Sequence, residues 1–413
     1  MAQIKPFCGI RPRRDLAERI AALPYDVYSR GEARKEVERE PLSFLKVDRA
    51  ETQFPPGTDI YEACVYEKAR DTLAQMLREG EFVRDDAACY YLYEQNMAGH
   101  RQTGIVGCAS IDDYIGQTIK KHENTREEKE RDRFRHIDIC GMQTGPIFLA
   151  YRADATLKAL VAEAKTAEPE TAFCSPDGVG HRIWVIRDGE RIEKIRRLFA
   201  GIDSIYIADG HHRAASAVKV GLKRRGEHPG CDGSEPFNYF LSVLFPDDEL
   251  QILDYNRVIL DTGGLEPGEL PNQIREKFTV EGPFTHAVRP SGKGEFSLYD
   301  ASGWYRLKIR PEYRSDDPVE GLDVSILQKE VLEPIFHIED PRIDPRIDFV
   351  GGIRGLEELE RRVHRDAGAA FALYPTSIGE LFAVADAGRL MPPKSTWFEP
   401  KLRSGLFLHS LED

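Results

Sequence analysis

The residues best suited to chemistry in this sequence are the consecutive Asp209-Gly210-His211-His212-Arg213, which follow an apolar run at 204–208. That run predicts a strand, and the alanine-rich stretch behind Arg213 predicts a helix over about 213–224. Glycine takes backbone shapes that other residues avoid, so Gly210 suits a tight turn from strand into helix. The following residues then fall in the first helical turn, where N–H groups and the helix dipole favour an anion.

Two histidines and an arginine in a first helical turn are electrostatically unfavourable for a bare helix, since cations stabilise its other end. A bound phosphate would remove that conflict. The segment therefore predicts a phosphate site made by Gly210, His211, His212 and Arg213. The alternative is an ordinary helix start with histidine and arginine side chains on the surface.

A second group of polar residues is Lys120-Lys121-His122-Glu123-Asn124-Thr125-Arg126, which leads into a charged helix predicted over about 124–135. Most of these charges are typical of a solvated, salt-bridged helix face. His122 and Glu123 differ because they precede the helix, where a carboxylate can point into a cleft. The second histidine of a zinc-protease motif does not follow, which excludes that class.

A third group lies near the end, at Pro392-Pro393-Lys394-Ser395-Thr396, followed by Lys401 and Arg403. Two prolines stiffen the segment, and Lys394, Ser395 and Thr396 offer donors to a phosphate or a carboxylate. The glycine-rich run of a Walker loop is missing. We expect a second anion site here that closes the active site, and the alternative is a solvated basic loop. Leu23-Pro24-Tyr25-Asp26, by contrast, suggests a structural role.

The elements that must position these residues predict a mixed α/β protein of three regions. These are an N-terminal α/β region over 1–105, a catalytic core of alternating helices and strands over 106–262, and a C-terminal α+β domain over 263–413, after the break at Gly263-Gly264. Two apolar runs around Asn96-Met97-Ala98-Gly99 predict a hairpin.

Composition limits the class of protein. The net charge of −13 over 413 residues disfavours a broad surface for duplex DNA, because such surfaces neutralise phosphates with cations. No apolar run is long enough for a membrane span. Seven scattered cysteines suggest reduced thiols, so we expect a cytoplasmic enzyme without nucleic-acid or membrane partners. The oligomeric state, a homo-oligomer included, stays open.

The pairing of Asp209-Gly210-His211-His212-Arg213 with an upstream His122-Glu123 resembles the free serine kinase branch of the ParB/sulfiredoxin superfamily. His211 stands where sulfiredoxins have a cysteine, which excludes sulfiredoxin chemistry. The whole chain also resembles a bacterial family of uncharacterised proteins sharing Leu-Pro-Tyr-Asp-Val, Lys-His-Glu-x-Thr, Ala-Asp-Gly-His-His-Arg and Pro-Pro-Lys-Ser-Thr.

This resemblance implies a ParB/sulfiredoxin-like mixed α/β core and transfer of a phosphoryl group to a small hydroxyl compound, above all free L-serine. The donor would be ATP, ADP or pyrophosphate, with Mg²⁺. Glu123 would be the general base, and Asp209 would orient the acceptor or hold Mg²⁺. The other implied roles are phosphate binding by Gly210, His211, His212 and Arg213, substrate binding by His122, Arg126 and Asp209, and donor contacts by Lys394, Ser395 and Thr396. The rivals are a ParB-like nucleotide-binding switch and a phosphatase that uses the same turn.

Overall fold

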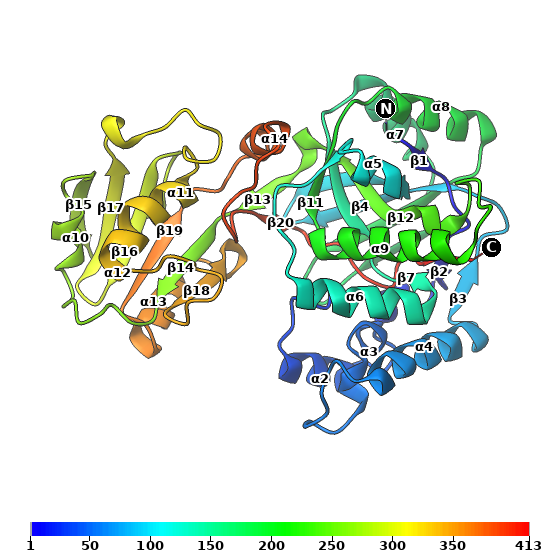
Figure 1. The fold of residues 1–413 in the computed structure, drawn as a ribbon, viewed down its shortest axis with the longest axis horizontal. Helices are drawn as coiled ribbons and strands as arrows, with labels where there is room; N and C mark the ends of the chain where they lie inside the picture. The colour runs from blue at the N-terminus through cyan, green and yellow to red at the C-terminus, as the bar shows by residue number, and fades with distance from the viewer. Residues whose placement is uncertain (1, 413) are drawn as a thin grey trace. The chain divides into compact units, whose positions relative to one another are not determined.

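The computed structural model describes residues 2–412, which form two compact units. The first unit holds the chain up to Leu250 together with the segment that starts at Pro400, and the second unit is Gln251–Glu399. Both contain helices and strands, which confirms the mixed α/β class (Figure 1). The ParB/sulfiredoxin assignment of the core stays a prediction.

The first unit is built on a nine-stranded mixed sheet, in which β6 and β11 are parallel, as are β8 and β12. Its main path runs β6-β11-β8-β12-β5-β4-β10-β9, and β1 pairs with β5. The strands are β1 (Ile4–Lys5), β4 (Tyr90–Met97), β5 (His100–Ser110), β6 (Ile119–Lys120), β8 (Ile147–Tyr151), β9 (Thr171–Cys174), β10 (Gly180–Ile186), β11 (Ile205–Asp209) and β12 (Tyr239–Pro246). Two small pairs join β2 (Ile10–Pro12) to β3 (Phe82–Arg84) and β7 (Met142–Gln143) to β21 (His409–Ser410).

The three regions expected from the sequence do not match these units. β4, from the region 1–105, and β12, from the region 106–262, both pair with β5, so they belong to one sheet. The second unit begins at Gln251, and the chain from Pro400 returns to the first. The hairpin of β4 and β5 is confirmed, and its turn residues Ala98 and Gly99 both have positive φ, as a two-residue hairpin turn requires.

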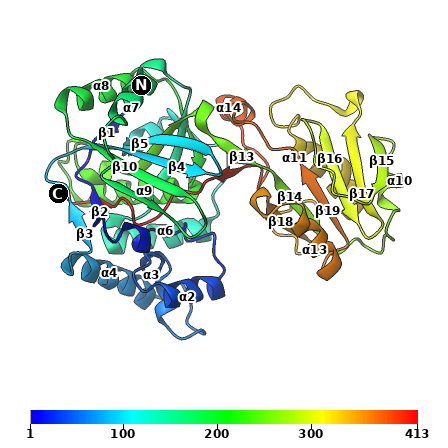
Figure 2. The same ribbon diagram turned by 180° about the vertical axis from the view of Figure 1, so that it is seen from behind.

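Alternate side chains of the large sheet face different partners. Ile147 and Leu149 of β8 and Ile207 of β11 share a core with apolar residues of α7, α8 and α9. The intervening side chains point to the other face of the sheet. There the rings of Tyr91 and Tyr93 contact Phe407 of the returning segment. Figure 2 shows this side of the sheet from behind.

The helices of the first unit are α1 (Ala17–Ile20), α2 (Arg30–Arg39), α3 (Leu45–Asp48), α4 (Ala63–Arg78), α5 (Ile111–Ile115), α6 (Glu127–Cys140), α7 (Ala155–Ala164), α8 (Gly189–Ala200) and α9 (His211–Glu227). α6 packs beside α9, and α4 packs beside α6 (Figure 1). A separate apolar cluster around Phe44, Leu73 and Met76 holds the N-terminal helices together.

The second unit contains a six-stranded antiparallel sheet of order β15-β17-β16-β19-β14-β18, and a pair of β13 with β20. Its strands are β13 (Gln251–Leu253), β14 (Tyr255–Ile259), β15 (Phe278–Phe284), β16 (Glu295–Asp300), β17 (Gly303–Ile309), β18 (Ile347–Gly351), β19 (Ala369–Leu373) and β20 (Trp397–Glu399). Its helices are α10 (Leu270–Gln273), α11 (Asp323–Leu327), the π-helical turn η5 (Gln328–Leu332), α12 (Glu333–Phe336), α13 (Glu357–Arg365) and α14 (Ile378–Asp386).

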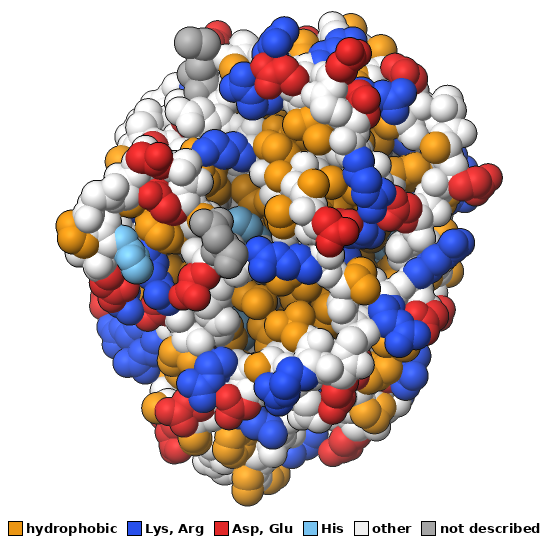
Figure 3. All heavy atoms as spheres, turned by 90° about the vertical axis from the view of Figure 1, so that its right-hand side faces the viewer, with side chains coloured by type: hydrophobic (Ala, Val, Ile, Leu, Met, Phe, Trp, Pro, Cys, Tyr) orange, Lys and Arg blue, Asp and Glu red, His pale blue; other side chains and the backbone are white. Residues whose placement is uncertain are grey.

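No helix within residues 2–412 combines the length and the apolar character that crossing a membrane requires. Basic and acidic side chains lie interspersed on the face drawn in Figure 3. Such mixing is typical of a solvated surface.

Candidate active site

The predicted strand–turn–helix segment is confirmed: β11 ends at Asp209 and α9 begins at His211. The pairing of β11 with β8 shifts register between Ile207 and Asp209, a β-bulge of the kind that re-aims side chains beside active sites. Gly210 links the two elements in the left-handed region, with φ 93° and ψ 30°. The bulge and the glycine together place Asp209 next to the first turn of α9.

Gly210 is required here for a second reason, which is the packing of Arg213. A Cβ at position 210 would lie 3.2 Å from Nε and Nη2 of Arg213. The guanidinium is held there because its Nη1 donates to the Pro146 carbonyl at 2.7 Å. Arg213 therefore lies against the backbone of the turn, and a Cβ at position 210 would press against its guanidinium.

The N-terminus of α9 has the properties of an anion site. Its N-cap residue is Gly210, which has no side chain to cap the N–H groups that follow it. The first N–H groups of a helix have no partner within the helix, and the dipole places about half a positive charge there. α9 is 17 residues long, so its dipole is well developed. A phosphate would satisfy these groups.

Asp209 is held by two partners. Its Oδ1 accepts from the Gly210 N–H at 2.7 Å, and its Oδ2 accepts from Lys401 Nζ at 3.0 Å. Burial alone would raise the pKa of Asp209, but the charges of Lys401 and Arg213 outweigh burial and hold that pKa well below its usual range. The carboxylate is therefore ionised at neutral pH. Mg²⁺ binding by Asp209 stays a prediction, and it would require Lys401 to move from Oδ2.

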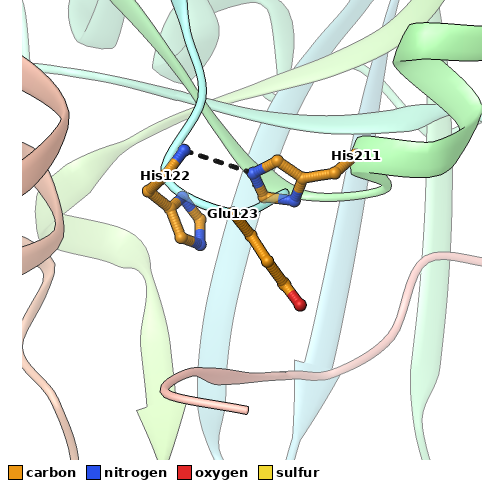
Figure 4. Close-up of side chains that lie close together, drawn as sticks. All are labelled: His122, Glu123 and His211. Atoms are coloured by element: carbon orange, nitrogen blue, oxygen red, sulfur yellow. Dashed lines mark hydrogen bonds between the residues drawn. The ribbon is translucent and has the colours of Figure 1, made fainter. Parts of the chain in front are cut away.

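His122, Glu123 and His211 come together, as Figure 4 shows. The rings of His122 and His211 lie edge to face with centroids 4.4 Å apart, and the His122 N–H donates to Nε2 of His211 at 3.5 Å. One ligand atom from each of the three residues lies within 4.8 Å of the other two, so the group could hold a metal ion. Two histidines and one carboxylate are a ligand set of catalytic zinc sites.

One nitrogen of His122 is suited to be a ligand. His122 is 2% exposed, and its Nδ1 has no hydrogen-bond partner within residues 2–412. That nitrogen is therefore available to a ligand.

Both buried histidines are neutral at physiological pH. Burial lowers the pKa of His122 to about 4, and burial together with the neighbouring His122 lowers the pKa of His211 well below its usual value. Because His211 is uncharged, the electrostatic repulsion that the sequence predicted for three cations at the start of this helix is smaller in the fold. His211 can act as a neutral hydrogen-bonding group.

We expect these histidines to make the fold sensitive to acid. An unfolded histidine takes up a proton below about pH 6.5, whereas His122 in the fold stays neutral until about pH 4. The free energy of unfolding should therefore be independent of this group above pH 7 and fall as the pH drops from about 6.5 toward 4. Urea denaturation between pH 7.5 and 4.5 measures this fall. His122→Gln should flatten it and His286→Gln, at an exposed site, should not; equal slopes in all three proteins would contradict the expectation.

Polar contacts between α6 and α9 hold the His122-Glu123 segment. The Thr125 hydroxyl donates to Glu130 at 2.7 Å, and Glu130 forms an ion pair with Lys219 of α9. The N–H of Arg126 donates to Nε2 of His212 at 3.0 Å. His212 therefore supports the segment through that nitrogen, while the side chain of Arg126 is exposed.

Behind the turn lies a buried cavity of about 20 Å³, lined in part by Tyr25, Arg133 and Arg213. The Arg133 guanidinium lies over the Tyr25 ring at 4.1 Å and pairs with Asp132 at 2.9 Å. A space of this size holds about one water molecule. Tyr25, for which the sequence suggests a structural role, lines this cavity together with Arg213.

Local sequence patterns did not predict the ion pairs between residues that are distant along the chain. Lys401 was expected to contact phosphate but pairs with Asp209, and Arg403 pairs with Asp177 and donates to Ser175. Lys394, Ser395 and Thr396 lie in the second unit, where the buried Ser395 donates to the Pro392 carbonyl at 2.6 Å. Their contact with a phosphoryl donor stays a prediction.

A family model described as "Protein of unknown function (DUF1015)" matches residues 4–325, so the chain belongs to this family. No curated protein matches the chain.

Solved structures with some likeness include a free serine kinase in complex with AMP, 15% identical, covering 71% of this chain and 86% of its own, with a TM-score of 0.36. A mutant of free serine kinase in complex with ADP is also 15% identical, covering 71% and 87%, with a TM-score of 0.36. SbnI with a C-terminal truncation, from Staphylococcus aureus, is 12% identical, covering 71% and 82%, with a TM-score of 0.36. The function proposed next therefore rests on the residues of the site.

Proposed function

We propose that the protein is a phosphotransferase that phosphorylates the hydroxyl of a small molecule, with free L-serine as the acceptor. One observation carries the proposal: the N-terminus of α9, whose N-cap residue is a glycine, lies beside a carboxylate that reaches it from another segment. A ligand atom of Glu123 is within 4.8 Å of one on His211, the first residue of α9. An anion-binding helix start with a proton acceptor next to it is what transfer of a phosphoryl group to a hydroxyl needs.

In the proposed reaction, Glu123 takes the proton of the acceptor hydroxyl, and the hydroxyl oxygen forms a bond to the transferring phosphorus. The bond from phosphorus to the donor oxygen breaks, and the electron pair leaves with the donor. N–H groups at the start of α9 and the guanidinium of Arg213 stabilise the charge on the phosphoryl oxygens. Asp209, ionised and fixed by Lys401, orients the acceptor.

The choice of serine follows from the likeness of the Asp-Gly-His-His-Arg and His-Glu motifs to those of free serine kinases. ATP, ADP and pyrophosphate remain the candidate donors, with Mg²⁺ as their usual counterion. His122 and Arg126 are proposed to contact the substrate, and Lys394, Ser395 and Thr396 to contact the donor. The cytoplasm is the compartment in which such metabolites are available.

Phosphorus NMR of the protein with L-serine, Mg²⁺ and each donor in turn tests the proposal. We expect an O-phosphoserine signal that grows as the donor signal declines, in equal amounts. Donor loss with release of inorganic phosphate alone would support a ParB-like nucleotide switch instead. A folded protein that gives no product with ATP, ADP or pyrophosphate would contradict the kinase proposal.

A phosphatase is the second candidate, and the His122, Glu123 and His211 group favours it. A divalent ion held by this group would supply an activated water next to the anion site. The same NMR experiment separates the two functions when it starts from O-phosphoserine with Mn²⁺ or Zn²⁺ and no acceptor. Release of inorganic phosphate under those conditions would identify the phosphatase.

A further inference from the structure

The second unit contains a buried cation that has no counterion. Arg257 of β14 is 4% exposed, and no carboxylate pairs with it anywhere in residues 2–412. Nη1 and Nη2 of the guanidinium donate to the carbonyls of Tyr255 and Pro393, the latter at 3.4 Å. An arginine has five N–H donors, and the remaining ones have no partner within the same described residues. Burial lowers the pKa of Arg257 to about 10, which leaves it charged at neutral pH.

Arg257 lines a cavity of about 270 Å³ that belongs entirely to the second unit. Val258, its neighbour in β14, packs in the core with α13, so Arg257 points from the opposite face of the sheet. The cavity is also lined by Gln328 and Leu332 of η5 and by Pro392 and Pro393. The volume of this cavity is small for a ligand pocket. It has room for an anionic group with a short carbon skeleton.

The other charges of this cavity leave Arg257 unbalanced. Arg342 and Asp340 both line it, but they pair with each other through Nε at 2.8 Å. Glu339 is exposed to solvent at the edge. The guanidinium lies over the Phe349 ring, 5.2 Å from its centroid, but a buried charge without a counterion is still costly. A guanidinium matches the planar, two-oxygen geometry of carboxylate and phosphate.

Two local features shape the cavity wall. The helix that starts at α11 widens into the π-helical turn η5 just before Pro334, because proline lacks an N–H and clashes with the preceding turn. Such π-helical turns frequently occur at functional sites. On the other side, Lys394 takes a positive φ of 59°, rare outside glycine, and the buried Ser395 holds the segment through Pro392. The Pro-Pro-Lys-Ser-Thr motif is therefore a fixed wall next to Arg257.

We propose that this cavity is a second ligand site, separate from the α9 turn, which binds a small metabolite through a carboxylate or phosphate group on Arg257. This site does not depend on the phosphotransferase proposal. The Gln328 side chain donates to the Ile338 carbonyl at 2.6 Å and so fixes the loop that bears Glu339 and Asp340. The ligand completes the hydrogen bonds of the guanidinium and neutralises its charge.

The test is calorimetric titration of the full-length chain with inorganic phosphate and, separately, with acetate, followed by thermal melting with and without each anion. The Arg257→Met protein should lose the affinity of this site for the anion by about tenfold or more. Its melting temperature without anion should equal or exceed that of the wild type, because an unpaired buried charge is removed. Arg310→Met, at an exposed site of the same unit, is the matched control and should behave as the wild type.

The two anions distinguish a phosphate ligand from a carboxylate ligand. A melting temperature that falls in Arg257→Met, with unchanged binding of both anions, would make Arg257 a structural residue and overturn the proposal. Hydrogen–deuterium exchange of the wild-type chain gives an answer even where the variant does not fold. The anion should slow exchange in the segments 328–342 and 392–396, and the same rates with and without both anions would also overturn it. Phosphate bound at the α9 turn would instead protect residues 210–214.

Discussion

Replacement of Glu123 by glutamine is expected to slow O-phosphoserine formation by about 10²–10⁴-fold, the usual contribution of a general base. Glutamine keeps the shape of the side chain but cannot accept the proton of the acceptor hydroxyl. In the proposed site, the donor is bound by the α9 turn and the cations near it, so the donor Kd should stay within about twofold. Initial rates measured by phosphoserine release, together with donor titration, give the two quantities.

Glu127→Gln is the matched control, because Glu127 opens α6 on its exposed side and pairs with Arg131. It should retain the full rate. Near-normal turnover of Glu123→Gln would exclude Glu123 as the base and leave Asp209 as the next candidate. Loss of donor binding in Glu123→Gln would instead indicate that the Glu123 carboxylate contacts the donor.

The second large effect is expected at Gly210. Alanine at a φ of 93° costs about 1–2 kcal/mol of folding free energy. Its Cβ would also lie 3.2 Å from the Arg213 guanidinium, tight enough to move that group by a few tenths of an ångström. Displacing a positioning group lowers the rate, by about 100-fold for a shift of about 1 Å. We expect Gly210→Ala to lose both stability in urea and turnover, with the larger relative loss in turnover.

Gly226→Ala offers a control in the same helix. A Cβ at Gly226 meets no atom within 4 Å, and alanine favours a helix interior over glycine by about 0.5–1 kcal/mol. This variant should be as stable as the wild type or slightly more so, with an unchanged rate. If Gly210→Ala behaved in the same way, the turn would not be the phosphate site.

Local patterns were sufficient where one short segment determines the structure. Gly210 after an apolar run predicted the turn between β11 and α9, and Ala98-Gly99 lies at the turn of the predicted hairpin. The helix that begins at α11 continues through η5 into α12, because Pro334 changes the hydrogen-bond pattern without ending the helix.

Contacts between distant segments could not be predicted in the same way. Lys401 meets Asp209 across 192 positions of the chain, and no spacing rule connects them. The same holds for Tyr25 and Arg133, whose stacking behind Arg213 depends on how α6 packs. The division into units was also not predicted, because the alternation of apolar and polar residues along a strand does not identify the strands with which it pairs.

The first unit receives its last segment only after the whole second unit has been synthesised, since the chain leaves at Leu250 and returns at Pro400. Leu408 then bridges Ile10, and Lys401 reaches Asp209. On the ribosome, a growing chain therefore lacks the Lys401 partner of Asp209 until the segment that begins at Pro400 has emerged from the exit tunnel. A chain that stops within the second unit therefore has the α9 turn but not the lysine that pairs with Asp209.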